Sequence, residues 1–317
     1  MSDPTAASTA VDSAGAYVTA AEHAEPTTGK SRSLWSDAWR NLRKRPTFII
    51  SMVIITFMII LAVFPSMFTS ADPTHQDLQR QMLKPSADAW FGYDFQGRDI
   101  MAGVAHGAKW SLLVGFFASL LTVLIGGTVG VIGGYAGGWL DGILSRIGDV
   151  FFGLPFVLGA IVILSAFRAA GLKSAFGLVI VVVLVISALT WPVAMRIMRS
   201  AAISAKQQDY VKAARALGAN SFRIITKHML PNCMAPVMVY ATILFGATIG
   251  VEATLSFLGI GLRAPAISWG VMIAESRDYV QHAPHLLLFP AGFLVLTVLA
   301  FVMLGDAVRD ALDPKLR

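Results

Sequence analysis

A basic segment at residues 209–231 separates two of the longest apolar stretches in the chain. It reads DYVKAARALGANSFRIITKHMLP. The spacing of its apolar residues predicts two short amphipathic helices, with Gly218 ending the first in a left-handed conformation and Asn220 or Ser221 capping the second. The two apolar faces would be Val211, Ala214 and Leu217, and then Phe222, Ile225 and Met229. The pattern predicts a helical hairpin whose small, basic corner can pair with a soluble partner protein.

Residues that could perform covalent or metal chemistry are scattered along the sequence. The single cysteine, Cys233, can form no disulfide within the chain, and no Cys and His residues have the spacing of a zinc site. The Gly29–Lys30 pair lacks the upstream glycine of a phosphate-binding loop, and the sequence has no GxSxG or HExxH motif. We therefore expect a protein that is not an enzyme and that holds no cofactor or metal of its own.

Glu252 is the one carboxylate well inside an apolar stretch. At about 1.5 Å per residue, it lies near one edge of a hydrocarbon core that is about 30 Å thick. A charge there costs about 3 kcal/mol unless it meets water or a partner, so a place in a substrate pathway is one interpretation. A hydrogen bond that ties its helix to the segment 259–285 is the other, and the sequence leaves both open.

The elements that must position these residues are membrane-spanning helices. The 317 residues are 56% apolar and only 14% charged, against about 25% charged in a soluble domain. Only helices or closed barrels satisfy the backbone inside lipid, and the apolar stretches do not alternate as barrel strands do. We expect an all-α integral membrane protein with six transmembrane helices. The predicted spans are Phe48–Phe68, Trp110–Gly134, Val150–Phe167, Gly177–Met195, Ala235–Leu258 and Leu286–Gly305.

Lysine and arginine are distributed unevenly between the segments that join these spans. The two ends of the chain and the segments 135–149 and 196–234 hold 17 of the 25, whereas 69–109, 168–176 and 259–285 hold eight. The positive-inside rule places both termini and the 196–234 loop in the cytoplasm, with the loops 69–109 and 259–285 outside. This asymmetry accounts for the net charge of +6, so we expect no nucleic-acid binding.

The N-terminal region precedes the first span. Residues 1–33 are rich in Ala, Ser and Thr and poor in large apolar residues, which predicts a disordered cytoplasmic tail. Residues 34–47 fit either an amphipathic helix along the inner membrane face or a basic stop that fixes the topology. The remaining residues, 48–317, form the predicted six-span domain.

Glycines repeat every four residues in the second span and just after it, at Gly126, Gly130, Gly134 and Gly138. Such spacing allows the backbones of membrane helices to approach closely. We expect static packing along this stripe, with a sliding surface as the alternative. Pro155 lies near the start of the third span and can kink it.

Several blocks resemble one family of membrane transporters. The pattern Ala213-Ala214-x-x-x-Gly218 followed by Leu230-Pro231 is similar to the EAA loop of permease subunits in binding-protein-dependent ABC importers. Lys212 replaces the glutamate of that motif, and His228 stands where many members carry isoleucine. Four further blocks look like the C-type permease of dipeptide and oligopeptide importers, and the similarity covers residues 34–317. They are FGYDFQGRDI at 91–100, GGYAGGWLDGILSRIGDVFFGLP at 133–155, SFLGIGLRAPAISWGVMI at 256–273 and LGDAVRDALDPKLR at 304–317.

The resemblance implies a type I ABC importer permease fold in the bacterial cytoplasmic membrane. It also implies a homologous second permease, one fused or two separate ATPase subunits that carry ATP and Mg, and an extracytoplasmic solute-binding protein that delivers a short peptide. The EAA-like loop would contact the ATPase. Its coupling residues would be Asp209, Tyr210, Val211, Lys212, Ala213, Ala214, Arg215, Leu217 and Gly218.

The outer face would then receive the solute-binding protein. Asp94, Arg98 and Asp99 are candidate docking residues, together with Trp269 on a short interfacial helix. The i, i+4 spacing of Asp94 and Arg98 fits an internal ion pair equally well. Permeases for nickel chelates or glutathione share these blocks, so the ligand stays open. A self-contained secondary transporter is a further alternative, which would need several ionisable residues at mid-membrane.

Overall fold

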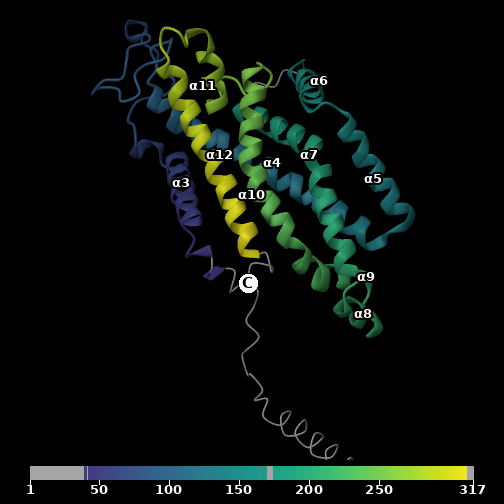
Figure 1. The fold of residues 1–317 in the computed structure, drawn as a ribbon. Coiled ribbons are helices and arrows are strands. Elements are labelled where there is room, and N and C mark those ends of the chain that lie inside the picture. The colour runs from purple at the N-terminus through teal and green to yellow at the C-terminus, as the bar shows by residue number, and fades with distance from the viewer. Residues whose placement is uncertain (1–38, 41, 170–173, 313–317) are drawn as a thin grey trace, which may run out of the picture. The chain divides into compact units, whose positions relative to one another are not determined.

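The computed structural model describes residues 39–40, 42–169 and 174–312. The chain divides into two compact units, residues 1–40 and 41–317. The larger unit is a bundle of helices, with no strand among its described residues (Figure 1). The all-α prediction is therefore confirmed, whereas the predicted tail, residues 1–33, lies outside the described residues.

Five helical segments are long and apolar enough to cross a membrane, and the bent pair α5–α6 makes a sixth if it is counted as one span. The helices α4, α7, α10 and α12 extend beyond their predicted spans at one end or both. The helix α4 begins at Ile100 rather than Trp110, α7 ends at Lys206 rather than Met195, α10 begins at Leu230 rather than Ala235, and α12 ends at Leu312 rather than Gly305. The main helices are α3 (Pro46–Val63), α4 (Ile100–Ala136), α5 (Gly138–Gly153), α6 (Phe156–Ala169), α7 (Ala175–Lys206), α8 (Asp209–Ala216), α9 (Ser221–Arg223), α10 (Leu230–Phe257), α11 (Trp269–Ser276) and α12 (His285–Leu312).

The predicted third span, Val150–Phe167, is kinked at Pro155, as the sequence allows. The chain forms α5 and α6 there, and their axes are bent by 88°. Pro155 has no backbone N–H and disfavours the helical region for the residue before it. Leu154 accordingly has φ −86° and ψ 121°, so α5 ends at Gly153.

The most extensive contact between two helices in the described bundle joins α4 to α7. A Cβ atom at Gly130 would lie 2.5 Å from the Met195 carbonyl oxygen, and one at Gly134 would lie 2.8 Å from the Ala202 Cβ. The absence of side chains lets the two backbones meet here, as the packing interpretation of the glycine stripe expects. Gly138 does not belong to the stripe, since it starts α5 with φ 59°.

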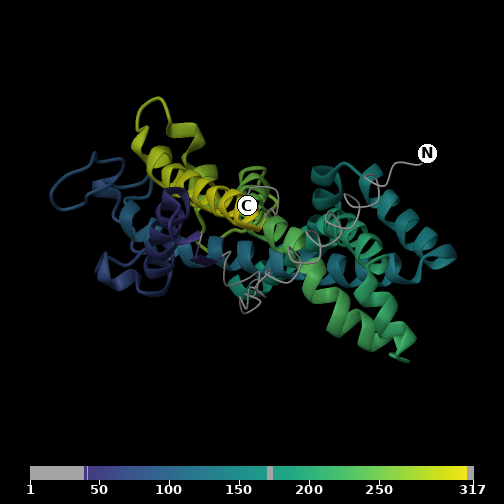
Figure 2. The same ribbon diagram turned by 60° about the horizontal axis from the view of Figure 1, so that its bottom comes forward.

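The two ends of the larger unit carry different segments (Figures 1 and 2). The start of α3 and the end of α12 lie near the end that carries α8 and α9, where Arg45 Nη1 donates to Asp310 Oδ2 over 2.5 Å. The segment 64–99 and α11 lie at the opposite end. These are called the α8 end and the α11 end below. In both views α3 and the α5–α6 pair occupy opposite edges of the bundle.

We expect Gly130→Ala to lower the free energy of unfolding by about 1–3 kcal/mol, because the new methyl group forces α4 away from α7. Gly250→Ala is the matched control, since a Cβ there meets nothing within 4 Å in the middle of α10. That variant should be unchanged or more stable by up to about 1 kcal/mol. Thermal unfolding of the purified variants in detergent checks this, and equal melting temperatures would contradict the packing role.

Candidate functional site

The segment after α7 forms a compact helical hairpin at the α8 end. Val211 and Ala214 of α8 are buried in one apolar cluster with Met198 and Ala202 of α7 and with Met229. Burial of one face of α8 holds the short helix against the bundle, because eight residues alone make an unstable helix in water. The hairpin is therefore a rigid continuation of α7.

The corner of the hairpin is set by Gly218. Its φ of +79° lies in the left-handed region, and a Cβ there would meet nothing within 4 Å, so backbone conformation alone favours glycine. Gly218 N–H donates to Arg215 O, and Ala219 N–H donates to Ala214 O, both over 3.0 Å. This pair of hydrogen bonds is a Schellman cap, as predicted for the end of the first helix.

The predicted apolar faces of the hairpin are partly wrong. Leu217 and Phe222, assigned to those faces, are instead 88% and 76% exposed. Leu217 follows the last turn of α8 and points outward from the cap. In the second half, Ile224–Met229 is a π-helical turn, whose i, i+5 spacing brings Ile224 rather than Phe222 onto the buried face with Met229.

The exposed corner combines apolar and basic groups. Lys212 Nζ donates to Asp209 Oδ1 over 3.0 Å, and both side chains remain largely exposed. Arg215 and Arg223 are exposed on either side of the corner. Partial burial raises the pKa of Tyr210, so its phenol stays neutral at pH 7. The corner therefore offers two apolar side chains within a positively charged rim, which is a common composition for a protein-docking surface.

Polar contacts tie the hairpin to the helices behind it. Lys206 Nζ donates to Tyr135 O over 2.6 Å, and Tyr135 Oη donates to Ser221 Oγ over 3.2 Å. About two turns back along α7, Arg199 makes two hydrogen bonds to the Asp141 carboxylate of α5, at 2.5 and 2.6 Å. These contacts connect the hairpin to the ends of α4 and α7, and α7 to the start of α5.

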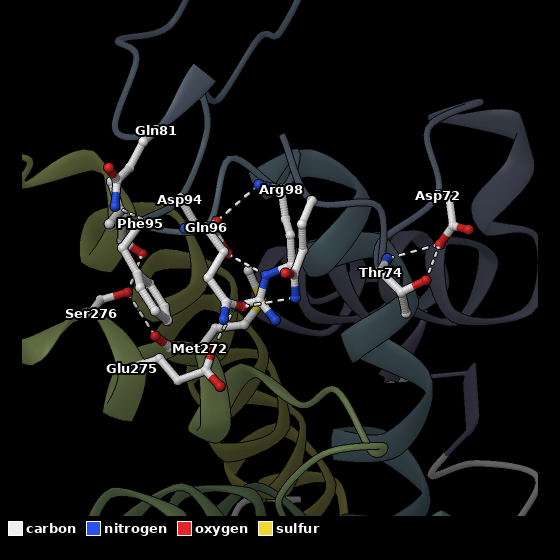
Figure 3. Close-up of polar contacts among 12 residues, drawn as sticks. Asp72, Thr74, Gln81, Asp94, Phe95, Gln96, Arg98, Met272, Glu275 and Ser276 are labelled. Carbon is white, nitrogen blue, oxygen red and sulfur yellow. Dashed lines mark hydrogen bonds and ion pairs between the residues drawn. The ribbon is translucent and has the colours of Figure 1, made fainter. Parts of the chain in front are cut away.

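The α11 end carries a second polar cluster, centred on Arg98 (Figure 3). Arg98 Nε donates to Asp94 Oδ2 and its Nη2 donates to Glu275 Oε2, both over 2.6 Å. Burial acts against the charge of Arg98, but the two carboxylates outweigh it and raise the pKa. The internal ion pair is therefore present, and Glu275 on α11 is a third member that residue spacing could not identify.

Two further predicted docking residues, Asp99 and Trp269, make hydrogen bonds to α4. Asp99 Oδ1 accepts from Ala102 N–H over 2.9 Å and caps α4. Trp269 begins α11 as predicted, but its side chain is 0% exposed and its Nε1 donates to Val104 O over 3.0 Å. The expectation that Trp269 lies at the interface is wrong, because the indole fills the space between α11 and α4.

Glu252 is 0% exposed and lies near the α11 end of α10. Its Oε1 accepts from Ser256 Oγ over 2.7 Å and from Ser268 Oγ over 2.9 Å, while Oε2 meets no partner among the described residues. Ser268 also caps α11 by accepting from Val271 N–H. These contacts correspond to the interpretation that ties the helix to the segment 259–285, and they leave Glu252 without an exposed surface.

The described residues contain no group of three or more His, Cys, Asp or Glu side chains that could hold a metal ion. What the geometry offers is two surfaces at opposite ends of a membrane bundle. The projecting hairpin at one end and the polar cluster at the other are both anchored on α4.

This fold and these sites define a class, the multi-pass helical membrane proteins that project a polar hairpin from one end. Residues 126–317 match the family model described as binding-protein-dependent transport system inner membrane component. Residues 33–85 match the N-terminal TM domain of oligopeptide transport permease C. The chain belongs to this family of transport components, and it is a multi-pass protein of the bacterial inner membrane.

Three relatives match nearly their whole length. The chain is 40% identical over 285 residues to the dipeptide transport system permease protein DppC of Alkalihalophilus pseudofirmus, covering 90% of this chain and 91% of that one. It is 37% identical to the oligopeptide transport system permease protein OppC of Bacillus subtilis, with 93% and 94% covered. It is 35% identical to the glutathione transport system permease protein GsiD of Pectobacterium atrosepticum, with 90% and 93% covered.

A solved structure shares the fold. An inward-facing conformation of the MetNI methionine ABC transporter has a chain that matches with a TM-score of 0.55 at 19% identity, covering 68% of this chain and 98% of that one. The family and this likeness confirm the fold of an ABC importer permease.

We expect Arg98→Gln to lower the free energy that holds the segment 64–99 against α11 by about 2 kcal/mol, because two partly buried carboxylates lose their charged donor. Amide hydrogen exchange should speed up at residues 94–99 and 270–276. Arg80→Gln is the control, since Arg80 makes a more exposed ion pair with Asp77 at 3.0 Å that contributes at most about 1 kcal/mol. Equal protection in the two variants would refute a clamp at Arg98.

Proposed function

We propose that this chain is one of two permease subunits of an ATP-driven importer and that it couples to a cytoplasmic ATPase through the loop 209–231. The observation that carries the proposal is the exposed corner of the hairpin. Leu217 and Phe222 project from a backbone that is fixed by burial and by the Gly218 cap. Exposed large apolar side chains on a rigid support are typical of surfaces that dock another protein.

Docking requires several groups on the corner to act together. Leu217 supplies an apolar anchor, and Lys212 and Arg215 supply positive charge for acidic groups on the partner. Ala213 faces outward with a small side chain, which permits close approach. Val211 and Ala214 face inward and support the corner. At its start Asp209 pairs with Lys212, and Tyr210 is part of the exposed surface. ATP and Mg would reside on the ATPase, one fused or two separate chains, so this subunit would perform no hydrolysis.

The opposite end would receive the extracytoplasmic solute-binding protein. We assign docking to the surface around Asp94, Arg98 and Asp99, because Arg98 fixes the segment 64–99 to α11 and gives a partner a preformed surface. Trp269 would act from beneath as a support. In this arrangement both termini are cytoplasmic, as the charge distribution predicts, and 48–317 is the membrane domain, preceded by the basic segment 34–47 and the tail 1–33.

The proposed cargo is a short peptide. Two of the three compared relatives are named as dipeptide or oligopeptide permeases, and the model matched at residues 33–85 is described for an oligopeptide permease. Glutathione, itself a peptide, is the second candidate, because the GsiD relative is 35% identical over a similar length. A homologous second permease would complete the pathway, and membrane lipid would surround both subunits.

Affinity purification of the tagged chain from its native membrane in mild detergent tests the proposal. We expect mass spectrometry to find a second permease and an ATPase in near-equal amounts. Recovery of the chain alone across several detergents would overturn the proposal in favour of a self-contained transporter.

Coupling through the corner is tested by Leu217→Ala. Because Leu217 is almost fully exposed, the melting temperature should not change. ATPase activity stimulated by the loaded solute-binding protein should fall about tenfold or more, as for the loss of an interface hot spot. Val53→Ala is the matched control, since Val53 is 64% exposed on α3, away from both proposed docking surfaces. If both variants retained full stimulated activity, the docking role of the corner would be wrong.

A further inference from the structure

A groove of about 840 Å³ opens between α3 and α4. Its α3 wall runs from Ile55 to Val63, and its α4 wall runs from His106 to Phe116. Phe245 and Phe301 close the floor, with their rings stacked at a centroid distance of 3.9 Å. The helix α3, which forms one wall of the groove, lies at the edge of the bundle opposite to α5 and α6 (Figures 1 and 2).

The two ends of this α3–α4 groove differ in chemistry. The inner part is lined by apolar side chains, whereas Lys109 and His106 lie at the α11 end. Lys109 is exposed, and its ammonium lies 5.4 Å from the ring centre of Trp110. It makes no ion pair with any described carboxylate. A tryptophan beside a lysine is typical of the level of the lipid headgroups.

His106 lies at the same end. Its Nδ1 lies 3.0 Å from Ala102 O, which makes Nδ1 the donor there, so that Nε2 of a neutral imidazole can only accept. Lys109 is therefore the side chain that can bind an anion at the α11 end of the groove.

The length of the groove fits one lipid leaflet. From Lys109 to Phe116 the helix rises about 10 Å, and from Ile55 to Val63 it rises about 12 Å. One leaflet contributes about 15 Å to the hydrocarbon core. A chain that starts at Lys109 and reaches the phenylalanine floor thus spans most of a leaflet.

The lining favours an acyl chain over a protein helix. Membrane helices pack through small residues that let their backbones approach. The residues that line the groove include large side chains such as Met58, Leu112 and Phe116, and Ala62 is the one small residue among them. An irregular apolar groove of this kind suits a flexible chain.

We propose that the α3–α4 groove binds one acyl chain of an anionic phospholipid, with the lipid phosphate against Lys109. The lipid belongs to the leaflet at the α11 end. Its headgroup lies beside the segment 64–99, so the bound lipid also packs α3 against the rest of the bundle. This site needs only that the chain spans a membrane, and it stands apart from the coupling role of the hairpin.

Native mass spectrometry of the delipidated importer complex tests the site. The complex is titrated in detergent with phosphatidylglycerol and, separately, with phosphatidylcholine. We expect the wild type to bind phosphatidylglycerol more tightly. Lys109→Gln should weaken phosphatidylglycerol binding about tenfold, as for the loss of one charge-assisted hydrogen bond, and should leave phosphatidylcholine binding unchanged.

Two further variants complete the test. Leu113→Trp should obstruct part of the groove and weaken the binding of both lipids, with assembly of the complex confirmed in the same spectra. Lys84→Gln, an exposed lysine that does not line the groove, should bind lipid as the wild type does. Unchanged phosphatidylglycerol affinity in Lys109→Gln overturns the proposal. Loss of the second permease from that variant, without a change in lipid binding, would assign the groove to a protein interface and would overturn it as well.

Discussion

Close contact between α4 and α7 is the constraint on which the rest of the larger unit depends. The two helices approach along Gly126, Gly130 and Gly134, where an added Cβ would collide with the α7 backbone or its side chains. The hydroxyls of Thr122 and Thr190, 2.9 Å apart, reinforce the same contact. Because α4 begins at the outer polar cluster and α7 continues into the hairpin, this one interface connects both ends of the molecule.

The hairpin shows how a short polar segment becomes a rigid surface. Its inward residues join the cluster that α7 and α10 build, and the Gly218 cap reverses the chain. Apolar side chains at this reversal then point away from the bundle. Leu217 owes its exposure to this reversal, and Phe222 owes its exposure to the π-helical turn that follows. The apolar groups at the corner are thus a product of local backbone geometry rather than of amphipathic periodicity.

The α11 end depends on buried polar contacts. Glu252 accepts from serines on both sides of the loop that follows α10, and Arg98 binds carboxylates on two segments. A buried carboxylate or guanidinium is tolerated only where such partners are present, which makes these contacts specific. They fix α11 and the segment 64–99 in one arrangement, beside which the Lys109 end of the α3–α4 groove lies.

The sequence by itself determined the helical membrane class, the glycine stripe and the Gly218 cap, because each depends on composition or on residues close together in the chain. Only the tertiary structure decided the angle of the bend at Pro155, the partners of Glu252 and Arg98, and the burial of Trp269. Arg98 and Glu275 are 177 positions apart, so spacing along the chain carries no information on their contact. The bend between α5 and α6 also depends on tertiary structure, because a proline permits a kink whereas packing against neighbouring helices sets its angle.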